Sequence, residues 1–191
     1  MKEKTRKQLL EGARIVFVRK GFADTTMVDI ARESGRGRRT LYCYFPNKRV
    51  LLRAVVEEEM NHILDILQAI VNKDIPADQK IMEFVISRLN NVRHSILRNG
   101  SLRSDYIRYM RVIGSVRNQC EKREILLIEQ ILQQGVHEGL FRVENTHYMA
   151  TIIHYTTKGL EAPYICGELD SNDHYRMLER TARKIIFGAL R

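Results

Sequence analysis

Residues 26–48, which read TMVDIARESGRGRRTLYCYFPNK, decide the fold of this chain. Thr26 stands before a short apolar-periodic run and Asp29 follows it by three positions, so the two predict a capping box at the start of a helix. The dipeptide Ser34-Gly35 then predicts the end of that helix. A second short helix is expected from about Gly37 until Pro46 breaks it. Two short helices joined by a tight turn with a glycine are typical of a helix-turn-helix, whose second helix enters the major groove of DNA.

The second of these helices carries side chains suited to nucleic acid. The candidates are Arg36, Arg38, Arg39, Thr40, Tyr42 and Tyr44. Arginine can donate two hydrogen bonds to the O6 and N7 of guanine, and tyrosine and threonine hydroxyls reach phosphates. The alternatives are a solvated basic face for the arginines and core packing for the tyrosines. We expect DNA contact from this helix.

The rest of the chain also has helical periodicity, and no strand alternation is evident. A helix is expected before the motif, where apolar residues from Leu9 to Phe17 recur at three- and four-residue steps and Gly21 is a stop signal. Further helices are expected over residues 48–72, 77–98, 102–116, 118–138, 145–161 and 172–190. This pattern predicts an all-α fold of about nine helices. We expect a three-helix DNA-binding domain over residues 1–50 and a larger helical body over residues 51–191.

The positive charge of the chain is concentrated at its N-terminal end. Residues 1–50 hold 13 Lys/Arg and 5 Asp/Glu, whereas the remaining 141 residues hold 19 and 18. Such a segment attracts a polyphosphate in a salt-dependent manner. A solvated surface without a partner, or attraction to an anionic membrane surface, would give the same charge pattern.

Several functional classes find little support in the sequence. Cys43, Cys120 and Cys166 are scattered, so neither a disulfide framework nor a zinc motif is predicted, and unpaired thiols suit a reducing interior. No signal peptide or membrane span is evident, and we expect a cytoplasmic protein. No phosphate-binding glycine loop, His-Glu-x-x-His or Gly-x-Ser-x-Gly motif occurs. We therefore expect no enzyme, no cofactor and no metal.

Three stretches resemble the TetR family of transcriptional regulators. The first runs from Leu9 to Phe22, the second from Thr25 to Ala31, and the third from Thr40 to Lys48. The third is similar to the family's signature, a Thr-Leu-Tyr-x-Tyr/His-Phe run followed by Ser/Asn-Lys. The resemblance covers roughly residues 7–55.

This resemblance implies an all-helical homodimer joined through the last two helices of each subunit. It also implies repression at a palindromic operator in double-stranded DNA, relieved when a small-molecule effector binds the body. By the family pattern, phosphate contacts fall on Thr26, Tyr42, Tyr44 and Lys48, and base contacts on Arg38, Arg39 and Thr40. The chain departs from the pattern at Arg36, Gly37 and Arg39, where the family usually has a small apolar residue, Ser and a small residue. We expect Arg36 to extend outward and the half-site to be rich in guanine.

The body offers weaker candidates for effector binding. Arginines interleave with tyrosines between residues 98 and 111, either lining a pocket for an anionic or aromatic effector or forming an exposed basic stripe. His147 and His154 share a helical face, for which a dimer-interface or core role is favoured over metal binding. The candidate effector contacts are Tyr106, Tyr109, Met110, Thr151 and Tyr155.

The sequence therefore predicts a dimeric, effector-controlled transcriptional repressor. One alternative keeps the DNA-binding domain but replaces the effector with another protein, which would make the chain a DNA-bound interaction or architectural protein. A second alternative is a small helical enzyme or peripheral membrane protein whose basic N-terminal segment is incidental.

Overall fold

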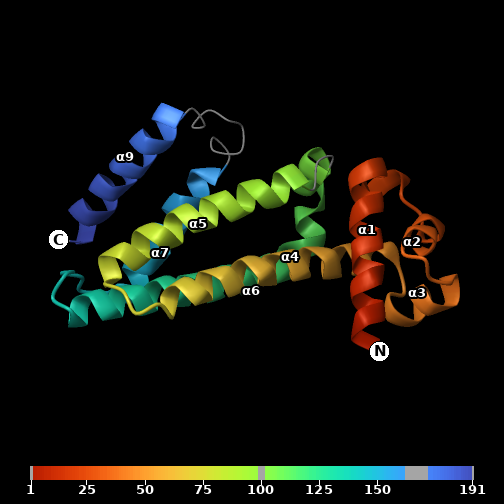
Figure 1. The fold of residues 1–191 in the computed structure, drawn as a ribbon, viewed down its shortest axis with the longest axis horizontal. Coiled ribbons are helices and arrows are strands. Elements are labelled where there is room, and N and C mark those ends of the chain that lie inside the picture. The colour runs from red at the N-terminus through yellow and green to blue at the C-terminus, as the bar shows by residue number, and fades with distance from the viewer. Residues whose placement is uncertain (1, 99–101, 162–171, 191) are drawn as a thin grey trace. The chain divides into compact units, whose positions relative to one another are not determined.

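The computed structural model of the protein describes residues 2–98, 102–161 and 172–190. All regular structure in these ranges is helical, which confirms the predicted all-α class. The helices are α1 (Lys2–Asp24), α2 (Met27–Glu33), α3 (Arg38–Tyr44), α4 (Lys48–Val71), α5 (Ala77–Arg98), α6 (Leu102–His137), α7 (Thr146–Gly159) and α9 (Asn172–Leu190) (Figure 1). None of these helices combines the length and apolarity needed to cross a membrane.

The chain forms two compact units, and neither is continuous in sequence. The first comprises residues 1–61 and 95–118, and the second comprises residues 62–94 and 119–191. Helices α4, α5 and α6 each contribute residues to both units. Helix α4 begins at Lys48 and runs without interruption through residue 50, so no loop or helix end marks the domain boundary expected there. That boundary stays a prediction.

The core of the first unit joins α1, α2 and α3 to the first turns of α4. Its members are Leu9, Leu10, Ala13, Val16, Phe17, Phe22, Ile30, Ala31, Leu41, Phe45, Leu51, Leu52, Ala54 and Val55. The apolar periodicity expected between Leu9 and Phe17 is therefore the buried face of α1. Gly21 has φ 74° and ψ 166°, so it interrupts α1 in a backbone conformation that favours glycine. The predicted stop signal lies at this kink.

The second unit buries apolar side chains from α4, α5, α6 and α7, and its helix ends are joined by polar contacts. The Glu138 carboxylate accepts a hydrogen bond at 2.9 Å from the backbone N–H of Ala77, at the start of α5. This bond, followed by one from Gln134, lowers the pKa of Glu138. The buried Lys80 ammonium donates to the Val71 carbonyl and to Gln134, each at 2.7 Å. Backbone groups that lack partners at helix ends are thus satisfied by side chains from other helices.

Helix α6 differs from the sequence prediction. Two helices, over residues 102–116 and 118–138, were expected there, whereas α6 is continuous from Leu102 to His137. Neither glycine nor proline flanks Asn118, and an asparagine in a helix costs less than about 0.7 kcal/mol relative to alanine. The buried residues Val116, Cys120, Glu124, Leu127, Ile128 and Ile131 recur at helical steps across this position. Their burial outweighs the weak preference of Asn118 for a helix end.

Candidate nucleic-acid interface and a buried polar cluster

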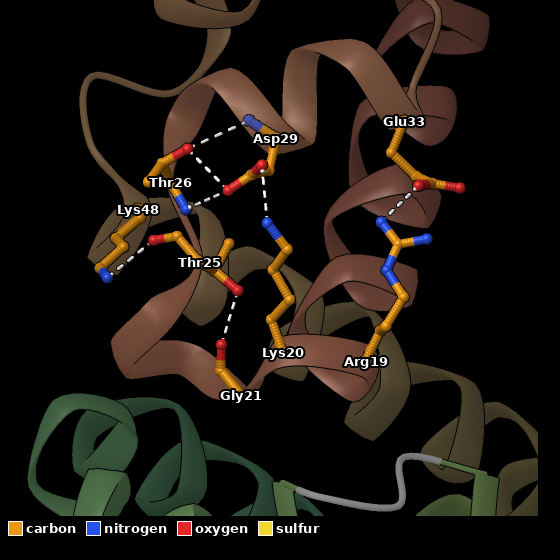
Figure 2. A network of polar contacts seen from close by, with 8 residues as sticks. All are labelled: Arg19, Lys20, Gly21, Thr25, Thr26, Asp29, Glu33 and Lys48. Atoms are coloured by element: carbon orange, nitrogen blue, oxygen red, sulfur yellow. Dashed lines mark hydrogen bonds and ion pairs between the residues drawn. The ribbon is translucent and has the colours of Figure 1, made fainter.

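The helix-turn-helix starts with the capping box that the sequence predicts. Thr26 is the N-cap of α2, and its hydroxyl oxygen accepts a hydrogen bond from the Asp29 N–H at 3.2 Å. The Thr26 N–H donates to the Asp29 carboxylate at 3.0 Å in return, and the Thr26 hydroxyl donates to the same oxygen at 2.7 Å. Figure 2 shows this reciprocal arrangement at the start of α2. The first turn of α2 is therefore fixed by its own side chains.

Two ion pairs fasten α2 to α1. The Lys20 ammonium lies 2.9 Å from Asp29, and the Arg19 guanidinium lies 2.8 Å from Glu33 (Figure 2). The hydrogen bond from Lys20, followed by those from Thr26, holds the pKa of Asp29 well below its usual range. Asp29 is thus ionised at neutral pH, and α2 is held at both of its ends.

The turn between α2 and α3 depends on glycine. Gly35 has φ 62°, a left-handed conformation in which a side chain would be strained. The N–H of Arg36 donates back to the Ala31 carbonyl at 3.0 Å, which closes the turn. Gly37 is the N-cap of α3 and has no side chain to cap it. Arg38 and Arg39 are therefore the first two residues of α3, and no capping side chain precedes them.

Arg38 and Arg39 open α3 and lie on the surface. Both side chains are exposed, and neither makes a hydrogen bond or ion pair with the described part of the protein. Thr40 is half-buried and Tyr42 is 51% exposed. These side chains retain free donors, which is what contact with base edges and phosphates requires.

The other four predicted DNA contacts have partners inside the first unit, and the Thr26 hydroxyl is engaged by Asp29 in the capping box. The Arg36 guanidinium donates to the Gln8 side chain of α1 through Nε at 3.2 Å and also through Nη2, so it does not simply extend outward as expected. The Tyr44 hydroxyl donates to the Lys2 carbonyl at 3.1 Å. The Lys48 ammonium donates to three backbone carbonyls. No sequence signal identifies the backbone carbonyls that accept from Tyr44 and Lys48, because every residue has a backbone carbonyl. Only the fold determines which carbonyl lies within reach.

A polar cluster lies in the second unit between α5, α6 and α7. Glu124, which is 5% exposed, accepts from Arg88 Nε and lies 3.1 Å from His154 Nδ1. Arg88 Nη2 also lies 2.8 Å from Glu161. Burial alone would raise the pKa of Glu124, but the hydrogen bond from His154 and the charge of Arg88 outweigh it and lower that pKa. This cluster was not found from the sequence, although burial of His154 agrees with its expected core role.

A small cavity adjoins this cluster. Its lining includes Phe84, Arg88, Glu124, Ile128, His154, Thr157, Lys158 and Glu161. His154 is 3% exposed, and its Nε2 is buried without a hydrogen-bond partner among the described residues. The predicted effector contacts Thr151 and Tyr155 lie outside this lining, and Tyr155 is exposed. Tyr106, Tyr109 and Met110 lie outside the residues whose side chains the structure describes.

Comparison with known proteins agrees with this geometry. Residues 9–55 match the family model described as bacterial regulatory proteins, tetR family. The chain is 29% identical over 149 residues to the HTH-type transcriptional regulator YfiR of Bacillus subtilis, which covers 74% of this chain and 70% of that protein. A transcriptional regulator from Cytophaga hutchinsonii is 25% identical with a TM-score of 0.75, covering 96% of this chain and 97% of that one.

The fold is shared more widely at lower identity. FadR of Bacillus subtilis, solved in complex with stearoyl-CoA, has a TM-score of 0.70 at 16% identity, covering 97% of this chain and 99% of that one. The matched segment, residues 9–55, spans the complete helix-turn-helix with its capping box and exposed arginines. Residues 9–55 therefore match the DNA-binding domain of the tetR family of bacterial regulatory proteins, and the comparisons support a DNA-binding transcriptional regulator of this family.

Proposed function

We propose that the protein is a cytoplasmic, dimeric repressor that binds a palindromic operator in double-stranded DNA and leaves it when a small-molecule effector binds. The observation that carries the operator-binding part is the pair Arg38 and Arg39. Both are exposed on the first turn of α3, without protein partners in the described part of the chain, directly after a turn closed by hydrogen bonding. A base edge in the major groove would supply the acceptors that these guanidinium groups lack.

The remaining contacts follow from where the side chains lie. We assign base reading to Arg38, Arg39 and Thr40, and phosphate contact to Tyr42 and Thr26. A phosphate would have to replace Asp29 as the acceptor of the Thr26 hydroxyl. Arg36 and Tyr44 each engage an acceptor on α1. A guanidinium has five N–H donors, so Arg36 can hold Gln8 and still donate to DNA. Tyr44 has one hydroxyl donor, and a phosphate would have to replace the Lys2 carbonyl as its acceptor.

Dimerisation through α7 and α9 is supported by an apolar stripe on α7. Tyr148, Ile152 and Tyr155 are 68%, 47% and 54% exposed and stand at steps of four and three residues on one face. On α9, Ile185 is 61% exposed. A second copy of the chain would cover these side chains through a two-fold interface, in which the same surface serves both partners. Two α3 helices related in this way suit a palindrome.

Effector control is supported by the buried polar cluster. The Nε2 of the buried His154 has no partner in the part of the chain that the structure describes, which is unusual because buried polar side chains generally find one. The Bacillus subtilis FadR neighbour binds stearoyl-CoA, so this fold can hold a ligand. An effector must favour a dimer whose α3 helices no longer match the half-site spacing, since equal affinity for both arrangements would shift nothing.

One observation favours the alternative of a DNA-bound interaction protein without an effector. The free volume of the cavity beside His154 is about 10 Å³, which corresponds to a single water molecule. An effector would have to open this cavity or bind elsewhere in the body. The two functions differ in one measurable property, namely whether any small molecule weakens the affinity for DNA.

Fluorescence anisotropy of the full chain on the DNA flanking its own gene tests the proposal. We expect binding to one palindromic stretch that survives excess competitor DNA. Binding that any duplex abolishes would instead show a non-specific anchor. Stearoyl-CoA is a suitable first compound to add to the bound complex. If an added compound lowers the affinity for the operator, effector control is supported. If none of the compounds tested lowers it, the interaction protein is favoured.

A further inference from the structure

We propose that Lys48 is a positioning residue for DNA recognition, which acts by fastening the first turn of α4 to the turn between α1 and α2. Its ammonium lies 2.8 Å from each of three backbone carbonyls, those of Phe22, Ala23 and Thr25. Figure 2 shows the side chain directed at the Thr25 carbonyl. This inference rests on the proposed sequence-specific binding of DNA. It assigns to Lys48 a role other than the phosphate contact expected from the sequence.

The number of donors decides between the two roles. A lysine ammonium has three N–H donors and no acceptor. The three carbonyls engage all of them, and the nitrogen also lies 4.7 Å from the centroid of the Phe22 ring, within cation–π range. A phosphate oxygen would have to displace one of these acceptors. Arg38 and Arg39, by contrast, reach the surface with their donors free of described protein partners.

The acceptors are available because α1 ends here. The kink at Gly21 leaves a final short turn over residues 22–24, and the last carbonyls of a helix lack partners within that helix. Their partial negative charge favours a cation. Thr25 belongs to the same turn, since its hydroxyl donates to the Gly21 carbonyl. Lys48 thus donates hydrogen bonds to carbonyls at the end of α1 that would otherwise bond to water.

The lysine is itself held at a fixed point of the backbone. It is the first residue of α4, and the Asn47 side chain before it accepts from the N–H groups of Arg49 and Val50 at 3.1 and 3.0 Å. On the other side of the contact, Thr25 directly precedes Thr26, the N-cap of α2. One ammonium therefore joins the end of α1, the start of α2 and the start of α4. Loss of that ammonium would loosen α2, and with it the turn that presents α3.

The test compares Lys48→Met and Lys48→Gln with the wild-type chain. Methionine removes every donor, whereas glutamine is uncharged but keeps an amide NH₂ that can donate to two of the carbonyls. Anisotropy titrations in increasing salt would use two probes, a random-sequence duplex and the flanking-DNA fragment. Thermal unfolding of each variant would be recorded alongside. Arg49→Met is the matched control, because it removes an adjacent exposed charge without touching the three carbonyls.

We expect Lys48→Met to weaken binding to the specific fragment about tenfold, which is about 1.4 kcal/mol. We also expect a lower unfolding midpoint for Lys48→Met, partial restoration of both properties in Lys48→Gln, and an unchanged salt slope on the random duplex. A slope flattened by about 0.9 in both variants would overturn the proposal, because it is the signature of a lost phosphate contact. If the wild-type chain shows no specific fragment, the proposed function fails. The salt slope and the unfolding midpoint still decide the role of Lys48.

Discussion

Gly12 of α1 lies against the backbone of Ser34, the residue that ends α2. A Cβ atom placed on Gly12 would come within 2.8 Å of the Ser34 N and Cβ atoms and 2.9 Å of its Cα. The close approach lets α1 support the first residue of the turn that leads to α3. Because the obstruction is mainly backbone, rotation of a side chain cannot relieve it.

Gly12→Ala should therefore destabilise the protein by about 1–3 kcal/mol, the usual cost of an extra methyl group in a packed core. Urea unfolding would measure the change, and DNA affinity should fall with it because the turn is displaced. Gly114→Ala makes the same chemical change on α6, where no described residue from another part of the fold lies within 4 Å of the added Cβ. That control should be neutral or slightly stabilising. Equal stability of the Gly12 variant and the wild type would show that α1 and α2 separate easily.

Arg38→Ala or Arg39→Ala should cost about 1–3 kcal/mol of operator affinity and relax the preference at one base position, if that arginine reads a base. The folding free energy should stay near the wild-type value, because neither side chain has a partner in the described structure. Binding to a panel of operator duplexes with single base changes would measure both effects. Lys122→Ala removes an exposed charge from the second unit and serves as the control. A uniform loss across the panel would identify the arginine as a phosphate contact instead.

The sequence predicts the helix-turn-helix well because its signals are local. The capping box at Thr26 and Asp29 and the glycine of the turn act within a few residues, so they appear in the sequence as they do in the structure. The partners of Lys48 could not be predicted in this way, because they are carbonyls 23–26 residues earlier in the chain. Continuity of α6 through Asn118 was missed for a related reason, since tertiary burial outweighs a weak local preference.

The ion pair between Lys20 and Asp29 should make the stability of the protein depend on acid pH. The pKa of Asp29 lies below its ordinary value of 3.8 in the folded protein, so the unfolded chain takes up a proton first as the pH falls. The stability that Asp29 contributes is complete above that ordinary value and is lost as the pH falls through the folded value.

Asp29→Asn should consequently be less stable than the wild type at neutral pH, and the difference should shrink below about pH 4. Chemical unfolding at a series of pH values would measure it. Asp24→Asn provides a control, because Asp24 is an exposed aspartate that forms no ion pair in the described structure. A difference between Asp29→Asn and wild type that stayed constant with pH would mean that the capping hydrogen bonds, and not the carboxylate charge, stabilise α2.

Ile152→Glu should convert the proposed dimer into monomers. Ile152 lies between Tyr148 and Tyr155 on the exposed stripe of α7, and a carboxylate there would have to be buried without a partner in a two-fold interface. Light scattering should show a fall from twice the 22.4 kDa chain mass to a single chain mass. The monomer itself should keep its helical content, since the side chain is already 47% exposed within one chain. Operator affinity should fall because each monomer engages only one half-site.

Leu126→Glu is the matched control, because Leu126 is 52% exposed on α6, outside the α7 stripe. It introduces the same charge at a similarly exposed apolar position and should leave the dimer intact. If Leu126→Glu dissociated the dimer and Ile152→Glu did not, the interface would involve α6 instead of the α7 stripe. The stripe of Tyr148, Ile152 and Tyr155 would then be available to another partner, which is the arrangement that a DNA-bound interaction protein requires.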